Sequence, residues 1–343
     1  MKRSAATPKS GTRAKTKPAR APVEAHLDKR AGISPSARLP AGPRAALTLG
    51  PLLHNWPADQ RRDFYFRIAD EAPVDTVCLG EVVCAKRAPF FDPHLDEVAE
   101  RLIRAGKEVV FSTLALVTGA RDMTFVADAA ARRGLVEAND LAAVELLRGK
   151  AHHVGPFVNV YSEDTARLLA RLGATRICLP VELPATAVGA IAAATAAECE
   201  VVAFGRVPLA MSARCFHARS RDRHKINCRF VCAEDADGLP VETAEGERFL
   251  AIAGCHILSH AYANLANEVA ALRAAGVKRF RLLPQAIDMV AVADVFRRRL
   301  DGRIGGAEAM AALRPLVAPE IAFVNGFVHG RAGEEWVADS LRA

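Results

Sequence analysis

The sequence lacks any long apolar run. Its longest stretch of low polarity, VGAIAAATAA at 188–197, falls well short of the roughly 20 apolar residues that a membrane-spanning helix needs. The basic start of the chain is also not followed by the apolar segment of a secretory signal. With neither segment, we expect a cytoplasmic protein without a transmembrane helix.

Several catalytic motifs are missing as well. Neither H-E-x-x-H nor G-x-S-x-G occurs, although a hydrolase needs an activated nucleophile or a metal with an open position. No G-x-G-x-x-G follows a predicted strand, which argues against a dinucleotide-binding open sheet. His152, His153 and His217 are possible acid–base groups, but a lone histidine is more often structural. The sequence therefore assigns no catalytic acid or base.

The positive charge is concentrated at one end of the chain. Residues 1–45 contain eleven lysines and arginines against two acids, a charge of +9, so the total of +7 leaves −2 for the remainder. This segment also has six prolines and few large apolar side chains, so it cannot bury enough surface to offset the entropy cost of ordering. We predict a disordered tail over 1–45 and no nucleic-acid partner.

The remainder of the chain alternates short β-branched runs with amphipathic segments. The predicted strands are 46–53, 74–81, 108–116, 134–140, 155–161, 175–183, 199–209 and 278–284. The predicted helices are 57–71, 91–105, 121–133, 141–149, 162–172, 184–197, 262–275 and 286–300. Eight such units predict a TIM-like (β/α)8 barrel over 46–330. An insertion at 210–261 with a small hairpin follows strand seven, and 331–343 forms a C-terminal tail.

Eight cysteines in a chain without a secretory signal are expected to remain reduced, so they either pack or bind metal. Cys78, Cys178 and Cys199 lie in apolar strand-like runs, where a thiol behaves as a small hydrophobic group. The remaining five lie outside such runs: Cys84, Cys215, Cys228, Cys232 and Cys255.

A C-x12-C-x3-C pattern in the insertion indicates a metal site. It comprises Cys215, Cys228 and Cys232, and the insertion follows a strand end, where barrel active sites lie. The fourth ligand should come from another loop at the same end of the barrel. Cys84, just past strand two, is the best candidate, and Cys255 is the alternative.

Four thiolates could bind Zn²⁺ or an iron–sulfur cluster. Structural zinc sites usually use two close cysteine pairs, and only Cys228 and Cys232 form one here. One pair with two distant single ligands favours a 4Fe–4S cluster, in which each iron binds one thiolate. Zinc, or thiols without metal, remain alternatives. Four arginines could offset the negative charge of a cluster: Arg214, Arg219, Arg223 and Arg229.

Several segments resemble the UbiV-like, ubiquinone-biosynthesis branch of the collagenase-like peptidase family over about 46–330. They are LGEVVCAKR, STLALV, VEAND, PVEL, PLAMSARCFHARSRDR and the C-x12-C-x3-C spacing. The resemblance implies a 4Fe–4S cluster on Cys84, Cys215, Cys228 and Cys232. The basic tail of 1–45 departs from the pattern of this branch.

The resemblance also implies a function and partners. The expected function is oxygen-independent, anaerobic hydroxylation of polyprenylated ubiquinone precursors, with this chain as a subunit of the hydroxylase. The expected partners are a UbiU-like sister protein, in a heterodimer, and a UbiT-like lipid-carrier protein. The alternatives are a scaffold subunit stabilised by zinc or a cluster, and a collagenase-like peptidase.

Overall fold

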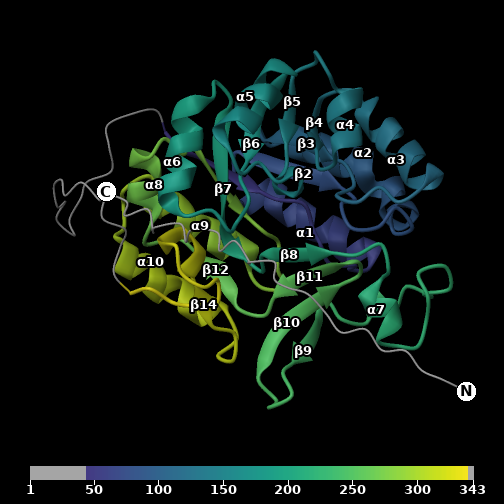
Figure 1. Ribbon diagram of the computed structural model, residues 1–343. Helices are drawn as coiled ribbons and strands as arrows, with labels where there is room; N and C mark the ends of the chain where they lie inside the picture. The colour runs from purple at the N-terminus through teal and green to yellow at the C-terminus, as the bar shows by residue number, and fades with distance from the viewer. Residues whose placement is uncertain (1–43, 339–343) are drawn as a thin grey trace, which may run out of the picture. The chain divides into compact units, whose positions relative to one another are not determined.

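The computed structural model describes residues 44–338. A closed parallel barrel forms its centre (Figure 1), and each strand pairs in parallel with the next, while β13 pairs with both β7 and β1 to close the ring. The predicted (β/α)8 barrel is therefore confirmed. Its strands are β1 (Ala46–Leu49), β2 (Thr76–Gly80), β3 (Glu108–Ser112), β4 (Leu135–Ala138), β5 (His152–Val154), β6 (Ala174–Cys178), β7 (Glu198–Gly205) and β13 (Arg279–Leu282).

Helices alternate with these strands and pack on the outside of the barrel (Figure 1). Their apolar faces supply the outer layer of the core, as the amphipathic periodicity predicts. The Ser162 hydroxyl caps α5 by accepting a hydrogen bond from the backbone N–H of Thr165 at 3.3 Å. The helices are α1 (Ala58–Glu71), α2 (Ala88–Arg104), α3 (Ala120–Ala130), α4 (Leu141–Leu146), α5 (Glu163–Arg171), α6 (Ala185–Ala194), α8 (Val269–Ala274), α9 (Met289–Leu300) and α10 (Gly306–Leu313).

The fifth strand lies earlier in the chain than the sequence predicts. The strand is His152–Val154, and the expected strand at 155–161 begins with a 3₁₀ turn at Pro156–Val158. Gly155 ends the strand beside Asn139, whose side chain would collide with any Cβ at that position. Two histidines concealed the strand, because they do not carry the β-branched apolar signal of a buried strand.

The segment expected to form a helix over 262–275 begins as a strand instead. Strand β12 (Tyr262–Asn264) pairs antiparallel with β7 and parallel with β14 (Phe323–Val324), and the helix starts only at Val269. The ring of Tyr262 is fully buried against Phe204 of β7. Packing against a neighbouring strand therefore overrides the helical periodicity of this segment.

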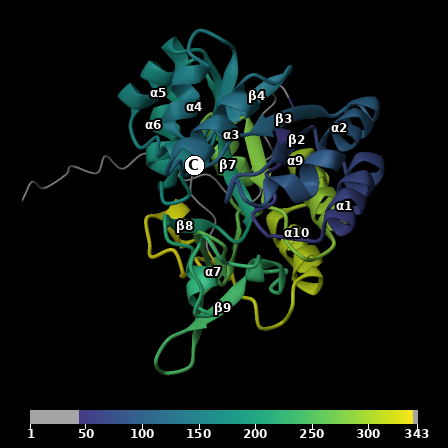
Figure 2. The same cartoon turned by 90° about the vertical axis from the view of Figure 1, so that its right-hand side faces the viewer.

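The insertion forms more than the small hairpin that the sequence predicts. It contains most of a four-stranded antiparallel sheet in the order β8-β11-β10-β9, with short helix α7 (Phe216–Arg219) beside it. Figures 1 and 2 show this sheet as a separate layer next to the barrel, with the β9–β10 hairpin projecting outward. The strands are β8 (Pro208–Met211), β9 (Leu239–Glu242), β10 (Arg248–Ala253) and β11 (His256–Ser259).

Charged and thiol groups occupy the interior of the barrel. The fully buried guanidinium of Arg281 pairs with the carboxylates of Glu137 and Glu200, the latter at 2.6 Å. Cys78 and Cys178 are buried beside this group, and burial raises the pKa of both thiols. Together with the buried Cys199, they are packing residues, as their apolar sequence context predicts.

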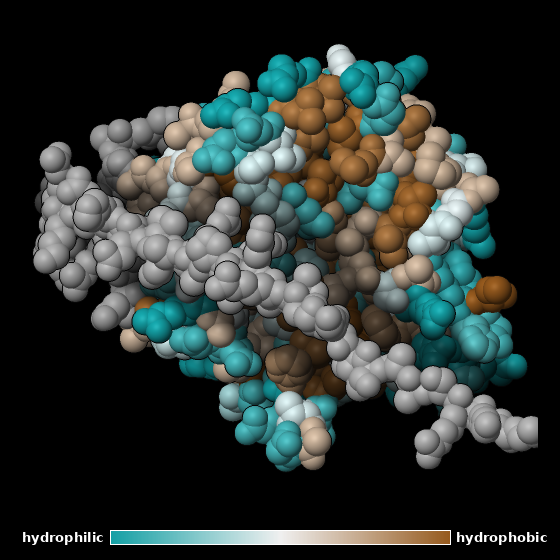
Figure 3. All heavy atoms as spheres, viewed as in Figure 1, coloured by the Kyte–Doolittle hydropathy of each residue, from teal (hydrophilic) through white to brown (hydrophobic). Residues whose placement is uncertain are grey.

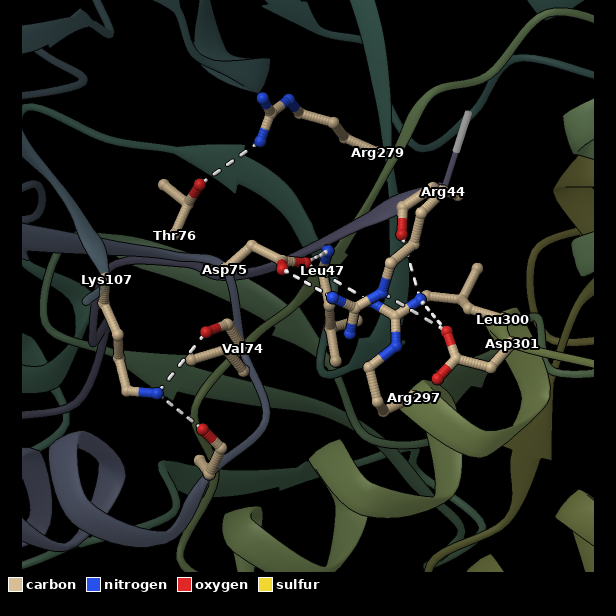
Figure 4. Close-up of polar contacts among 12 residues, drawn as sticks. Arg44, Leu47, Val74, Asp75, Thr76, Lys107, Arg279, Arg297, Leu300 and Asp301 are labelled. Atoms are coloured by element: carbon tan, nitrogen blue, oxygen red, sulfur yellow. Dashed lines mark hydrogen bonds and ion pairs between the residues drawn. The ribbon is translucent and has the colours of Figure 1, made fainter. Parts of the chain in front are cut away.

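Ion pairs connect the amino ends of the strands (Figure 4). The Arg297 guanidinium of α9 lies 3.3 Å from Asp75 and 2.8 Å from Asp301, and it donates to the carbonyl of Ala45 at 3.0 Å. Asp75 also accepts a hydrogen bond from the Leu47 amide at 2.7 Å. These contacts join β1, the loop before β2 and helix α9.

The described residues contain no helix long and apolar enough to cross a membrane. The predicted tail of 1–45 lies outside them except for Arg44 and Ala45. Within the predicted C-terminal tail, Val337 exchanges backbone hydrogen bonds with the Asn325 side chain at 2.7 and 2.9 Å. This part of 331–338 is therefore bonded to the chain that follows β14.

Candidate functional site

One small cavity brings together the four cysteines that the sequence singles out. Cys84 comes from the loop after β2, and the others come from the insertion after β7. The cavity has a volume of about 20 Å³ and is bordered by the half-buried Cys84 and Cys232. It is lined by Cys84, Lys86, Arg87, Cys215, His217, Lys225, Cys228, Phe230, Val231, Cys232 and Gly254.

The loop after β2 fixes the position of Cys84. The Glu81 carboxylate accepts hydrogen bonds from the amides of Val83 at 2.9 Å and Cys84 at 3.0 Å. The Arg87 guanidinium lies 3.2 Å from the same carboxylate and donates to the carbonyl of Leu53 at 3.1 Å. Glu81 and Arg87 are both buried, so this ion pair positions the loop without contacting solvent.

Turns in the insertion present the other three thiols. Cys215 is the N-cap of α7, and its sulfur accepts a hydrogen bond from the Ala218 amide at 3.5 Å. Cys228 and Cys232 flank a sharp turn, in which Arg229 and Phe230 both have positive φ, 50° and 55°. Because of this left-handed turn, Cys228 and Cys232 both line the same cavity.

Hydrogen-bond donors from the barrel point at two of these sulfurs. The Lys86 ammonium lies 3.3 Å from Cys228 Sγ, and the Asn55 amide donates to Cys232 Sγ at 3.3 Å. Lys86 also donates to the carbonyls of Lys225 and Ile226, at 2.6 and 3.0 Å. Donors and positive charge of this kind stabilise thiolate sulfur.

The cations that line the cavity differ from those that the sequence suggests. They are Lys86, Arg87 and Lys225. The four arginines expected to offset cluster charge do not line it, and three of these are exposed. Proximity in sequence to the cysteines therefore does not place these side chains in the lining of the cavity, and the fourth, Arg223, is half-buried. The set considered was Arg214, Arg219, Arg223 and Arg229.

Cys255 lies against this site. The neighbouring Cys255 thiol lowers the pKa of Cys84 to about 7 and that of Cys215 to about 6. The same two contacts raise the pKa of Cys255, while burial raises the pKa of Cys232 to about 11. Cys255, the alternative fourth ligand of the sequence analysis, thus lies next to Cys84 and Cys215, although it belongs to the β10–β11 hairpin.

The three candidate histidines lie in two different places. His217 lines the cavity, fully buried, with Nε2 2.8 Å from the Asp235 carboxylate. His152 and His153 belong to β5; burial, with a further contribution from Arg176, lowers the pKa of His153 to about 4. His153 pairs in register with Glu137 and so faces the charged barrel interior, whereas His152, one residue earlier on the strand, points to the opposite side, and only His217 lies beside the thiols.

The donor set is four thiols, the ligand type of both zinc and iron–sulfur centres. Among residues 44–338, no three histidine, cysteine or acidic side chains converge closely enough to bind one metal ion. A tetrahedral zinc needs sulfurs about 3.8 Å apart, given a Zn–S distance of about 2.3 Å. A four-iron cluster binds each thiolate at a different iron and so accepts a wider spacing.

A second, larger cavity lies at the carboxyl ends of β5, β6 and β7. Its volume is about 230 Å³, and its lining combines apolar side chains with polar groups, among them the exposed Tyr161 hydroxyl, which donates to Glu182 at 3.3 Å. Hydrophobic residues gather on the face of the barrel above the four-stranded sheet (Figure 3). The lining residues are Pro156, Phe157, Asn159, Tyr161, Pro180, Val181, Glu182, Pro208, Leu209, Ala210 and Met211.

The two cavities border the same buried cluster. Phe157 and Met211 line the second cavity and also pack against this cluster, which contains Cys215, Cys228 and Cys255. Both cavities lie at the end of the barrel where enzymes of this fold bind their ligands.

Comparison with known proteins places the chain in a family. A solved structure with some likeness is the spore coat polysaccharide biosynthesis protein SpsE from Bacillus subtilis, at 10% sequence identity and a TM-score of 0.42. That match covers 90% of this chain and 79% of the other. The sequence profile described as Peptidase family U32 matches residues 65–338, which is most of the chain and nearly all of its described part. The chain thus belongs to peptidase family U32.

Proposed function

We propose that this protein is an iron–sulfur subunit of the UbiV-like branch of the family, required for oxygen-independent hydroxylation of ubiquinone precursors. The observation that carries the proposal is the convergence of Cys84 with Cys215, Cys228 and Cys232. These residues lie on segments more than a hundred positions apart, yet they line one cavity at the carboxyl end of the barrel. Packing alone gives no reason for four thiols and three cations to meet there.

The four cysteines would bind a 4Fe–4S cluster, which supplies electron transfer when bound. The chain contributes donors to the anionic sulfurs: the Lys86 ammonium to Cys228, the Asn55 amide to Cys232 and the Ala218 amide to Cys215. Hydrogen bonds to the sulfurs are one of the factors that set the potential of such a group.

The second cavity supports a substrate role. Its mixed lining suits a substituted aromatic ring: apolar side chains such as Phe157 and Leu209 would contact the ring, and the Tyr161 and Glu182 pair would bind a ring hydroxyl. A ring bound there would lie against Phe157 and Met211, which pack on the buried cluster that contains Cys215 and Cys228. The resemblance supplies the partners of the proposal: a UbiU-like sister subunit and a UbiT-like lipid carrier.

A genetic experiment tests the proposed function. Deleting the gene in the source organism should leave ubiquinone normal in air and abolish it without oxygen, with under-hydroxylated precursors accumulating. Reintroducing the gene with Cys215→Ala should not restore anaerobic ubiquinone synthesis. Reintroducing it with Cys199→Ala, which changes a buried cysteine outside the site, should restore it. Normal anaerobic ubiquinone in the deletion strain, or full rescue by Cys215→Ala, would refute the hydroxylation role and favour the scaffold alternative.

One observation favours a second candidate, peptide hydrolysis. Cys215 is the N-cap of α7, and its pKa is lowered. His217, two residues later, is hydrogen-bonded to Asp235 at 2.8 Å. A cysteine, a histidine and an orienting acid are the parts of a cysteine peptidase. This candidate predicts that metal-free protein cleaves peptides and that His217→Gln abolishes cleavage. If metal-free protein has no peptidase activity, the peptidase candidate is refuted and only the cluster proposal remains.

A further inference from the structure

Cys255 lies in a tight turn that is bonded to the chain on both sides of Cys215. Strands β10 and β11 pair through Ala253 and His256, so Gly254 and Cys255 form the two-residue turn between them. The Gly254 carbonyl accepts from the His217 amide at 3.3 Å, and the Cys255 carbonyl accepts from the Ser212 amide at 2.9 Å. Gly254 has φ of +66°, a conformation that favours glycine.

The other side of this turn meets the loop that carries Cys84. A Cβ at Gly254 would lie 3.1 Å from Val83 Cγ1, so the two segments are in direct contact. Cys84 packs against the buried cluster that contains both Cys215 and Cys255. The turn thus places the Cys255 thiol between the two segments that supply the proposed ligands.

Exposure distinguishes the roles of the two neighbouring thiols. Cys255 is 1% exposed, so a solute cannot reach it directly. Cys84 is half-buried and borders the cavity, so it is the member of the pair that a solute meets first.

We propose that Cys255 is a resolving thiol, which forms a disulfide with Cys84 when the site is free of metal. The inference deepens the proposed function, since it describes the same site without its cluster. Formation of the disulfide itself does not require that a cluster ever binds. The oxidant is a low-molecular-weight disulfide such as oxidised glutathione.

The exchange proceeds in two displacements. The Cys84 thiolate attacks one sulfur of the small disulfide, forms a mixed disulfide and releases one small thiolate. The Cys255 thiolate then attacks the Cys84 sulfur and releases the second. The two protein thiols lose two electrons and two protons, and the oxidant becomes two thiols. The new bond occupies a ligand of the cluster and protects Cys84 from irreversible oxidation.

The test uses metal-free, full-length protein treated with oxidised glutathione, followed by peptide mapping under non-reducing conditions. The expected product is a Cys84–Cys255 disulfide, with iron and sulfide reloading only after a dithiol reductant is added. Cys255→Ser should instead retain glutathione on Cys84, and Cys199→Ser should behave as the unmodified protein does.

Absence of a disulfide to Cys255 in the unsubstituted protein would overturn the inference, as would pairing of Cys84 with Cys228 or Cys232 or pairing of Cys255 with Cys215. The mapping of unsubstituted protein decides this even if Cys255→Ser fails to fold. A protein that forms the disulfide but never assembles a cluster would refute the proposed function alone. A protein that assembles the cluster but forms no disulfide would refute this inference alone.

Discussion

The two ends of the barrel use polar residues in different ways. At the amino end, charges pair with one another and with backbone carbonyls: Arg297 contacts Asp75, Asp301 and the Ala45 carbonyl. The carboxyl end also has an ion pair, Glu81 with Arg87, but there the donors Lys86 and Asn55 point at cysteine sulfur as well. The polar contacts at the amino end therefore stabilise the packing of strands and helix, whereas the donors at the carboxyl end surround thiols that could bind a further group.

The cysteines of the barrel strands and those at the carboxyl end also differ in their pKa values. Cys78, Cys178 and Cys199 are buried in the barrel, and burial raises the pKa of each, to about 11 for Cys199. At the carboxyl end the pKa shifts are mixed: those of Cys84 and Cys215 are lowered, while those of Cys232 and Cys255 are raised. The barrel thiols are thus uniformly protonated packing groups, whereas the carboxyl end includes thiols that ionise more readily, and the thiolate is the form that binds metal.

The largest expected effect separates the two sets of cysteines. Alanine at any one of the four proposed ligand positions should remove or destabilise the proposed iron centre, because in a 4Fe–4S cluster each thiolate binds one iron. The variants are Cys84→Ala, Cys215→Ala, Cys228→Ala and Cys232→Ala, and iron per chain in anaerobically purified protein is the measurement.

The matched controls are Cys78→Ala, Cys178→Ala and Cys199→Ala, which should retain full iron at some loss of stability. If Cys84→Ala retained a full iron load, the cluster would have another fourth ligand, and Cys255 would be the first residue to test in its place.

A smaller effect is expected at the amino end. Arg297→Met should lower the free energy of unfolding by about 2 kcal/mol, because hydrogen bonds to charged partners are lost and Asp75 and Asp301 lose their cation. Denaturant unfolding measures the change. Iron per folded chain should not change, so a variant that lost iron while remaining folded would show that the two ends are coupled.

The smallest effect is expected from the charge beside the thiols. Lys86→Met keeps much of the side-chain volume but removes the ammonium that lies 3.3 Å from Cys228 Sγ. The iron centre should still assemble, with a more negative reduction potential, because removing a positive donor favours the oxidised, less negative form. A potential equal to that of unsubstituted protein would mean that Lys86 does not contact the bound centre.

Much of the architecture could be predicted from the sequence, because the barrel follows from local periodicity and from the rule that parallel strands place their loops at one end. The same rule identified Cys84 as the partner of a cysteine pattern far along the chain. The fifth strand was misplaced because its two histidines, His152 and His153, are both buried, and apolar patterning gives no signal for buried polar residues.

Other features of the site depend on tertiary contacts that no spacing encodes. Asn55 reaches Cys232 from the loop after β1, and Lys225 lines the cavity only because the insertion folds back. Cys255 had one available signal, a glycine before it between two strand-like runs, which indicates a tight turn. The strand β12 at Tyr262–Asn264 was hidden because its pairing with β7 and β14 depends on residues distant in sequence.

Metal analysis of the full-length protein purified without oxygen tests the central claim most directly. The account predicts a brown protein with broad absorbance near about 400 nm and about four irons and four sulfides per chain. Exposure to air should bleach it. A colourless protein containing about one zinc per chain, or no metal at all, would contradict the account.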